Sequence, residues 1–418
     1  MNKYFKLLSL LIICGACSKT PQIVDIIEDN FEFADQQLRY AISQIDSTTV
    51  NFTKEEKEKQ LVCPRSINTE NKLIMIPSKD WCSGFFPGEL WYMYEYTGDD
   101  YWRKAAEKYT AYIEREKLNG KTHDMGFKIY CSFGNGYRLT QNETYKNIMI
   151  KAAETLITRY NPNVGCIRSW NHHKHKWQFP VIVDNMMNLE LLFWAYNQTK
   201  DKTFYDIAVS HARTTLKNHF RDDFSSYHVI DYDTITGKVL KRNTHQGFSD
   251  ESAWARGQAW GLYGYTMCYR ETHIPAFLEQ AKKIANYIYT HKNLPSDKIP
   301  YWDFNAPNIP NEVRDVSSAT IIASALYELS KYDTKKSEKY ISWADSIINN
   351  LTNAYRANLA QSYGFLLLHS TGSAPHESEI DVPLVYADYY FLEALLRRQQ
   401  LISMPKKLKP DNKENPSN

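Results

Sequence analysis

The stretch Ser252-Ala-Trp-Ala-Arg-Gly-Gln-Ala-Trp-Gly-Leu-Tyr-Gly-Tyr265 says most about the fold. At helical spacing, Arg256 and Trp260 share one face and three glycines form a close-packing edge. Each glycine inside a helix costs about 1 kcal/mol relative to alanine, so packing or function must require it. A guanidinium beside indole rings favours a site for a carboxylate and a flat ring. The structural alternative is a buried helix whose arginine reaches water.

Apolar periodicity near 3.6 residues extends along the chain and predicts about twelve helices. The expected ranges are 23–46, 84–97, 99–118, 126–139, 143–160, 184–198, 202–220, 252–270, 274–292, 315–331, 336–354 and 383–400. One strand signal, residues 227–232, precedes a Thr236-Gly237 turn and predicts a small β-hairpin.

The links between these helices alternate in length. Short turns such as 96–99, 139–142 and 198–201 join neighbours within a pair, as in antiparallel helical hairpins. Longer links rich in glycine, proline and tryptophan separate the pairs. Six such hairpins predict an all-α fold, the (α/α)6 barrel, with the small β-hairpin as an insertion. An open helical solenoid is the alternative, but the irregular repeat spacing disfavours it.

The composition excludes some functions and leaves others open. The 418 residues contain 50 Lys and Arg and 48 Asp and Glu, so the formal net charge is only +2. A chain with so little net charge has no strong positive electrostatic field that would attract nucleic acid. The 30 tyrosines and 10 tryptophans suit sugar stacking, but they suit a large helical core equally well.

The sequences of the two chain ends predict a cleaved export signal at the N-terminus and a disordered tail at the C-terminus. Residues 1–17 have the pattern of a lipoprotein signal, with a basic start, a short apolar run and Cys17 at the cleavage site. We therefore expect export, with the protein periplasmic or attached to a bacterial membrane only through a lipid on Cys17. Residues 18–402 are expected to form a single domain, and residues 403–418 a disordered tail. The five remaining cysteines fit neither a full disulfide framework nor a metal-binding motif.

Each inner helix of the expected pairs begins after a long link with an acidic residue. The six residues are Asp80, Asp124, Asp184, Asp250, Asp315 and Asp381. For any single one of them, helix capping is the better explanation. In a closed ring, however, all six would surround one mouth. A mouth lined by carboxylates and by Trp81, Trp91, Trp254 and Trp260 predicts a sugar-processing pocket, without saying which carboxylates react.

Several motifs resemble those of the unsaturated glucuronyl hydrolases, glycoside hydrolase family 88. They occur in order at residues 81–88, 123–127, 179–188, 245–247, 254–265, 314–317, 379–381 and 386–395. The resemblance implies an (α/α)6 barrel, in agreement with the helix count. It also implies removal of a 4,5-unsaturated uronic acid from the non-reducing end of oligosaccharides left by polysaccharide lyases, above all those from glycosaminoglycans.

The same resemblance assigns roles to residues. Asp184 would be the general acid and base, and Asp124 its essential partner. Substrate contacts would come from Trp81, His123, His228, Gln246, Trp254, Arg256 and Trp260. Arg256 would hold the substrate carboxylate or hydroxyls, and Trp81 and Trp260 would stack on the sugar. The chemistry needs a protonated Asp184, so its pKa should be raised, by burial and by the charge of Asp124.

No cofactor and no metal are expected. Residues 171–175, Asn-His-His-Lys-His, suggest a metal site, but they lack a paired carboxylate and better fit a solvated or ligand-contacting loop. Two functional alternatives stay open at this point. One is a rhamnogalacturonyl hydrolase acting on pectin fragments, and the other is a glycan-binding lipoprotein without catalysis. The oligomeric state is not predicted.

Overall fold

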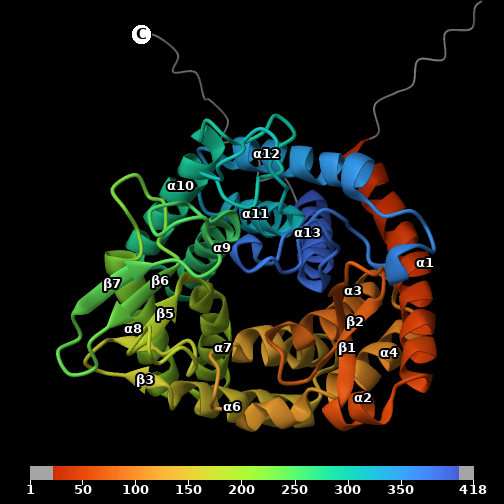
Figure 1. Ribbon diagram of the computed structural model, residues 1–418, viewed down its shortest axis with the longest axis horizontal. Helices are drawn as coiled ribbons and strands as arrows, with labels where there is room; N and C mark the ends of the chain where they lie inside the picture. The colour runs from red at the N-terminus through yellow and green to blue at the C-terminus, as the bar shows by residue number, and fades with distance from the viewer. Residues whose placement is uncertain (1–21, 404–418) are drawn as a thin grey trace, which may run out of the picture.

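The computed structural model describes residues 22–403, and twelve helical segments in it form a closed double ring (Figure 1). The outer ring consists of α1 (Ile23–Val50), α4 (Asp100–Ala111), α6 (Glu143–Ile157), α8 (Lys202–Asn218), α10 (Pro275–Thr290) and α12 (Ser337–Asn350). The chain alternates between the outer and inner rings. This is the predicted (α/α)6 barrel.

The inner ring is less regular than the outer one. Four of its segments are α3 (Phe85–Thr97), α9 (Ala255–Thr272), α11 (Val316–Leu329) and α13 (Val385–Ser403). Another begins as a π-helix, η3 (Gly126–Gly134), and continues as α5 (Asn135–Thr140). The sixth begins as a 3-10 helix, η4 (Val183–Asn188), and continues as α7 (Leu189–Thr199). Single α-helices were predicted at both places, and the two irregular starts carry residues of the site described below.

The twelve predicted helices are all present, with ends shifted by a few residues. Several smaller elements were not predicted: α2 (Lys54–Lys59) and 3-10 turns η1 (Trp81–Gly84), η6 (Ser362–Gly364) and η7 (Ala374–His376). The helix predicted at 99–118 ends early, at Ala111, and its last five residues form a 3-10 turn, η2 (Glu114–Leu118). Helix α12 also ends in a short π-helix, η5 (Leu351–Tyr355).

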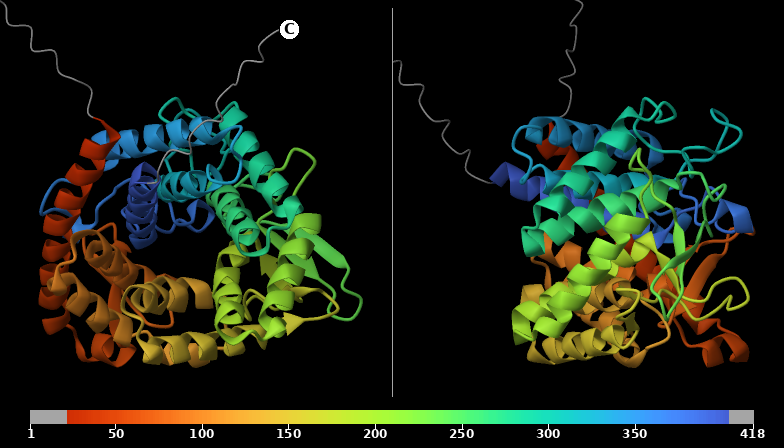
Figure 2. Two further views of the ribbon diagram at one scale, coloured as in Figure 1. Left: turned by 180° about the vertical axis from the view of Figure 1, so that it is seen from behind. Right: turned by 90° about the vertical axis from the view of Figure 1, so that its left-hand side faces the viewer.

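The strands lie in the loops that lead into the inner ring. The predicted hairpin exists as β6 (Val229–Tyr232) and β7 (Val239–Asn243), but it is part of a three-stranded sheet with β5 (Pro180–Ile182). Two antiparallel pairs were missed: β1 (Leu61–Ile67) with β2 (Leu73–Pro77), and β3 (Tyr160–Asn161) with β4 (Cys166–Ile167). The edge-on view in Figure 2 shows the strands and long loops together at one end of the ring.

The glycines of the 252–265 stretch allow α9 to pack closely against η4. A side-chain Cβ on Gly264 would lie 2.5 Å from the Cβ of Met186, and one on Gly257 would lie 3.4 Å from Val183 Cγ1. Real Cβ atoms do not approach carbons as closely as 2.5 Å, so Gly264 has no substitute without a shift of the backbone. The predicted close-packing edge therefore fixes the segment that carries Asp184.

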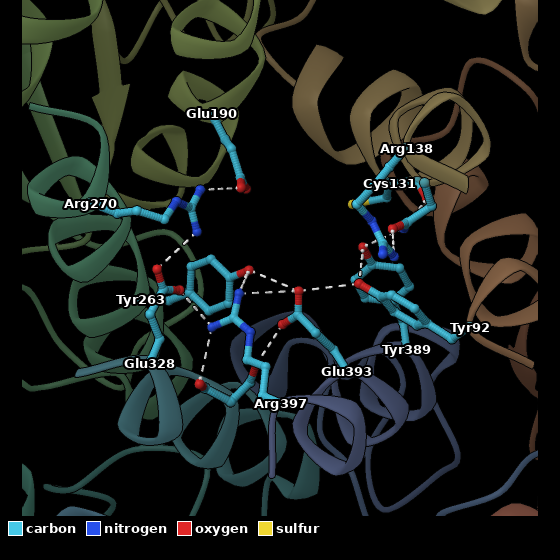
Figure 3. Close-up of polar contacts among 12 residues, drawn as sticks. Tyr92, Cys131, Arg138, Glu190, Tyr263, Arg270, Glu328, Tyr389, Glu393 and Arg397 are labelled. Atoms are coloured by element: carbon cyan, nitrogen blue, oxygen red, sulfur yellow. Dashed lines mark hydrogen bonds and ion pairs between the residues drawn. The ribbon is translucent and has the colours of Figure 1, made fainter. Parts of the chain in front are cut away.

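A buried ion network joins the inner helices on the other side of the barrel interior (Figure 3). Arg270 of α9 and Arg397 of α13 both pair with Glu328 of α11, at 2.9 and 2.8 Å, and Arg270 also pairs with Glu190 of α7. Glu393 accepts hydrogen bonds from the hydroxyls of Tyr263 and Tyr92. These groups line a cavity of about 350 Å³ to which all six inner segments contribute.

The described cysteines are buried and free, and no helix within residues 22–403 has the length and apolarity needed to cross a membrane. The predicted signal, with Cys17, and nearly all of the predicted tail lie outside the described residues.

The ion network predicts a measurable stability difference. Burial raises the pKa of Glu328, but Arg270 and Arg397 outweigh burial and lower that pKa to about 2. Replacing Glu328 with Gln leaves two buried guanidinium groups without this counter-charge. We expect Glu328→Gln to reduce the free energy of unfolding by about 3 kcal/mol at pH 7, measured by urea unfolding followed by circular dichroism.

The exposed Lys151–Glu154 pair provides the control, and Glu154→Gln should cost less than about 1 kcal/mol. Because the folded-state pKa of Glu328 is depressed, its contribution is complete above the unfolded value of about 4.3 and is lost as the pH falls toward 2. The difference between wild type and Glu328→Gln should shrink over that range. Equal effects of the two substitutions at pH 7 would contradict a stabilising role for the network.

Candidate active site

The loop end of the barrel contains a cavity of about 280 Å³ that unites much of the predicted site. It lies between the loops that enter the inner ring, and Phe127 lines both this cavity and the one beside the ion network. The predicted residues in its lining are Trp81, His123, Asp124, Asp184, Gln246 and Arg256. Residues that sequence analysis missed include Arg65, Trp170, His245 and Tyr386, while His172 comes from the 171–175 loop, for which contact with ligand was considered.

Asp184 lies in the first turn of η4, directly after β5, and is only 8% exposed. Its Oδ2 atom accepts no hydrogen bond from the described residues. Burial raises the pKa of Asp184 to about 6, and the nearby Asp124 charge adds to the rise, while His123 and Arg256 oppose it. This is the direction that a general acid near neutral pH requires, and burial is the main cause.

His228, which immediately precedes β6, faces Asp184 from behind the cavity wall. Its Nδ1 accepts backbone N–H bonds from His245 and Gln246, both at 3.1 Å, so a neutral ring carries its proton on Nε2. That Nε2 lies 3.6 Å from Asp184 Oδ2. Burial lowers the pKa of His228 well below its usual value, with His245 and Arg256 adding to the effect. A neutral imidazole thus lies beside the carboxyl group at a distance longer than a hydrogen bond.

Asp124 has the opposite electrostatic environment. Its Oδ1 lies 3.1 Å from His123 Nε2, and its Oδ2 accepts a hydrogen bond from the Thr122 hydroxyl. Although burial favours the neutral form, His123 and Thr122, with the buried Lys128, lower the pKa of Asp124 to about 2. One cavity therefore holds an ionised aspartate and a second aspartate that binds its proton near pH 6.

Arg256 is 1% exposed, and both of its terminal nitrogens already bond to the protein. It pairs with Asp315 at 2.8 Å and donates to the carbonyl oxygens of Thr371 and Gly372, at 2.7 and 2.5 Å. The guanidinium holds the 371–372 loop against the cavity and places positive charge near Asp184. Because Arg256 also lines the cavity, the expectation that it holds the substrate carboxylate or hydroxyls stays a prediction.

The predicted tryptophans have different environments. Trp81 lines the cavity and packs on Tyr386 with ring centroids 4.9 Å apart. Trp254 and Trp260 are outside the lining: Trp254 packs on His228 at 4.5 Å, and the fully buried Trp260 packs on Phe127 at 5.1 Å. The expectation that Trp260 stacks on the sugar is therefore wrong, because neighbouring rings cover the indole of Trp260. Trp91 lies in the core, where its Nε1 donates to Thr110.

The other acidic residues at the mouth have structural partners. Asp80 caps η1 and pairs with Arg65, which also pairs with Glu379. Asp250 accepts hydrogen bonds from Asn243 and the Thr244 N–H, and Asp381 pairs with His369. Capping or loop fixation accounts for these residues, as expected for most of the six.

Gln246 lines the cavity while its amide donates to the carbonyl oxygen of Gly372, which fastens the 245–247 and 371–373 loops together. The histidines of the 171–175 loop lie at the cavity mouth. No group of three or more metal-ligating side chains within residues 22–403 is arranged to hold a metal ion.

Some lining residues could have been found from the sequence, and others could not. His245 and Tyr386 belong to motifs already quoted, and Trp170 and His172 lie in or next to the histidine-rich loop. Arg65 comes from β1, in a segment for which no element was predicted. No signal in the sequence connected it with the site.

Comparisons with known proteins agree with this geometry. The family model for Glycosyl Hydrolase Family 88 matches residues 51–291. An unsaturated glucuronyl hydrolase of Formosa agariphila is 52% identical over 342 residues, which are 81% of this chain and 85% of that protein. An unsaturated chondroitin disaccharide hydrolase of Streptococcus pneumoniae is 33% identical, covering 80% and 85% of the two chains.

A solved structure shares the whole architecture. The crystal structure of an unsaturated glucuronyl hydrolase specific for heparin superimposes with a TM-score of 0.84 at 44% identity, covering 91% of this chain and 98% of that one. Together with the match over residues 51–291, this similarity shows that the chain belongs to glycoside hydrolase family 88.

Proposed function

We propose that this enzyme removes a 4,5-unsaturated uronic acid from the non-reducing end of oligosaccharides produced by polysaccharide lyases. The observation that carries the proposal is the pair of aspartates in one cavity, with the pKa of Asp184 raised to about 6 and that of Asp124 lowered to about 2. Two carboxyl groups with opposite protonation states supply both a proton donor and a fixed negative charge.

The reaction begins at the enol ether formed by C4, C5 and the ring oxygen of the sugar. The Asp184 carboxyl group donates its proton to C4, and the positive charge that develops is shared by C5 and the ring oxygen. The ionised Asp124 stabilises this charge electrostatically, because the buried cavity screens it less than water does.

Water completes the step. It adds to C5 as it transfers a proton to the Asp184 carboxylate, which restores the acid. The hemiketal at C5 then opens, and the hemiacetal left at C1 expels the partner sugar, leaving a 4-deoxy-5-keto uronic acid. The neutral His228, with its Nε2 3.6 Å from Asp184, orients the carboxylate during its change of charge.

We infer that the substrates come from glycosaminoglycans. Relatives that act on heparin and on chondroitin disaccharides support this substrate class. None of the relatives named above is a hydrolase of pectin fragments, so they do not support the rhamnogalacturonyl hydrolase alternative. A binding protein without catalysis would not need a buried aspartate whose pKa lies near 6.

We also propose that the protein is exported and anchored through a lipid on Cys17, as the pattern of residues 1–17 suggests. Labelling with a radioactive fatty acid in a bacterial host, compared between the wild type and Cys17→Ala, tests this. Equal label in both would exclude a lipid at Cys17.

Substitution of each aspartate tests the mechanism. Asp184→Asn cannot donate or recover the proton, and Asp124→Asn removes the fixed charge. We expect kcat to fall at least about 10²-fold in each, measured as loss of the ultraviolet absorbance of the C4=C5 bond in an unsaturated disaccharide. The exposed Asp206→Asn on α8 is the control and should retain full activity with the same helical circular dichroism. Wild-type activity in Asp184→Asn or Asp124→Asn would remove that residue from the mechanism.

The pH profile tests the protonation states. Because the free enzyme must carry the proton on Asp184, kcat/KM on an unsulfated disaccharide should fall about tenfold per unit as the pH rises above about 6. The ionised Asp124 should produce no decline on the acid side until the pH approaches 2 or the protein unfolds. A profile that stays level from pH 6 to 8.5 would contradict Asp184 as the proton donor.

Arg256→Lys tests the positioning of the loop. An ammonium group cannot pair with Asp315 and also reach the carbonyls of Thr371 and Gly372 in the planar geometry of a guanidinium. We expect kcat/KM to fall about 10²-fold because the 371–372 loop moves. The exposed Arg213→Lys on α8 should have no effect. An unchanged kcat/KM in Arg256→Lys would show that this loop does not position the substrate.

A further inference from the structure

The loop of residues 244–252, between β7 and α9, is fastened to a buried carboxylate that does not line the active-site cavity. The Phe248 N–H donates to Asp303 Oδ2 at 2.9 Å, and the Ser252 hydroxyl donates to the same oxygen at 2.7 Å. The other carboxylate oxygen, Oδ1, accepts the N–H of Asn305 at 2.8 Å. Asp303 is 0% exposed, and all three of its partners are donors, which suit the ionised form. The proposed reaction does not use this buried charge.

Gly247 allows the loop to approach Asp303. A side-chain Cβ on Gly247 would lie 2.7 Å from Thr244 Oγ1 and 3.2 Å from Asp303 Oδ2. The Gly247 N–H donates to the same Thr244 hydroxyl oxygen at 2.8 Å. A larger residue at position 247 would therefore push the loop away from the carboxylate.

The same loop holds one edge of the His228 ring. The backbone N–H groups of His245 and Gln246 both donate to His228 Nδ1, at 3.1 Å. They come just before Phe248 in the chain, so the bond from Phe248 to Asp303 fixes the segment that carries them. Because Nδ1 accepts two hydrogen bonds, it cannot also carry a proton, and the neutral ring keeps its proton on Nε2.

The segment around Asp303 also supports one face of the ring. Asp303 and Trp254 are opposite each other in an antiparallel backbone bridge. The indole of Trp254 packs on the His228 ring, with centroids 4.5 Å apart. Asp303 thus stands behind both the loop that bonds to His228 and the residue that covers it.

His228 in turn lies beside the proposed general acid. Its Nε2 is 3.6 Å from Asp184 Oδ2, and neither atom has a hydrogen-bond partner within residues 22–403. A small shift of the ring would change this distance. A second proton on the ring would place a positive charge next to Asp184 and favour its ionised form, which cannot donate a proton.

The titratable groups that face His228 are mostly basic. They are His245 on the loop, Arg256 on α9, His219 at the end of α8 and His123 before η3, with Asp184 on η4 as the acidic group. Burial lowers the pKa of His228 well below its usual value, and the basic groups lower it further. Burial raises the pKa of Asp303, while its hydrogen bonds and the charge of Arg221 oppose the rise.

We propose that Asp303 is a positioning residue, whose carboxylate fixes the 244–252 loop and, through the backbone N–H groups of that loop, holds His228 in one neutral tautomer beside Asp184. This inference rests on the proposed function, because that function assigns His228 and Asp184 to the reaction.

Two substitutions at position 303 separate hydrogen bonding from charge. Asp303→Ala and Asp303→Asn both remove the negative charge, but the amide oxygen of asparagine can replace Oδ2 and accept from Phe248 and Ser252. We expect kcat/KM on an unsaturated disaccharide to fall about tenfold in Asp303→Ala and to stay within about threefold of the wild type in Asp303→Asn. Equal losses in the two variants would show that the charge acts rather than the bonds, and would overturn the proposal.

Nuclear magnetic resonance of protein labelled with nitrogen-15 histidine observes the ring without turnover. The spectrum of His228→Asn identifies the His228 signals by their absence. In the wild type and in Asp303→Asn, we expect the Nε2–H tautomer from about pH 8 to about pH 5.5. In Asp303→Ala, both tautomers should appear, and the midpoint of ring protonation should rise by at least about one pH unit. Unchanged His228 signals in Asp303→Ala would overturn the proposal.

A double variant tests whether Asp303 acts through His228. Adding Asp303→Ala to His228→Asn should lower kcat/KM by less than about threefold, compared with about tenfold in the wild-type background. The same loss in both backgrounds would show that Asp303 acts by another route.

Gly247→Ala replaces Asp303→Ala if that variant does not fold, because the added Cβ displaces the loop while Asp303 remains. The same change in the His228 signals is then expected, and unchanged signals would overturn the proposal. If the wild type hydrolyses no unsaturated disaccharide, the proposed function fails, and the His228 signals still test the effect of the loop. If the wild type is active and Asp303→Ala keeps its kcat/KM and its His228 signals, only the positioning role fails.

Discussion

The close contact between α9 and η4 is the constraint on which the active site depends. Gly264 leaves no room for a side chain beside Met186, and Gly257 lies against Val183, so the first turn of η4 is fixed on the inner ring. The same helix holds the 371–372 loop through Arg256. Helix α9 thus positions both η4, which bears Asp184, and the 371–372 loop, which forms a wall of the cavity. This contact accounts for Gly264 and Gly257, whereas Gly261 lies against Phe220 and Ile284, at 3.4 Å.

The two aspartates show how the contacts within a fold set the protonation states of two carboxyl groups. Asp184 is buried and the side chain of Asp124 is only 18% exposed, and removal from water by itself raises the pKa of either one. Asp124 has a histidine and a hydroxyl within bonding distance, and these outweigh burial. Asp184 has an Oδ2 without a donor and a histidine that stays neutral, so burial prevails. The difference comes from what each carboxyl group touches, since the cavity is common to both.

Much of this arrangement could be predicted from the sequence. Periodicity located all twelve helices because their buried faces repeat every 3.6 residues. The close-packing edge of glycines followed from spacing, but of the six acidic residues expected at one mouth only Asp124 and Asp184 line the cavity. The strands β1 and β2 were missed because residues 61–77 are too short and irregular to show alternation, and with them Arg65 was missed. The burial of Trp260 and the partners of Arg256 depend on contacts between distant segments, which no local pattern records.

Different parts of the barrel contribute to its stability and to its choice of substrate. The network around Glu328 joins the inner helices α9, α11 and α13 through buried charges, and none of its members lines the active-site cavity. The cavity mouth is built from three loops that are fastened by a few bonds, such as that of Gln246 to Gly372. A change in these loops alters the sugar that fits while the inner ring keeps Asp124 and Asp184 in place. Relatives that act on heparin and on chondroitin fragments are therefore compatible with one barrel.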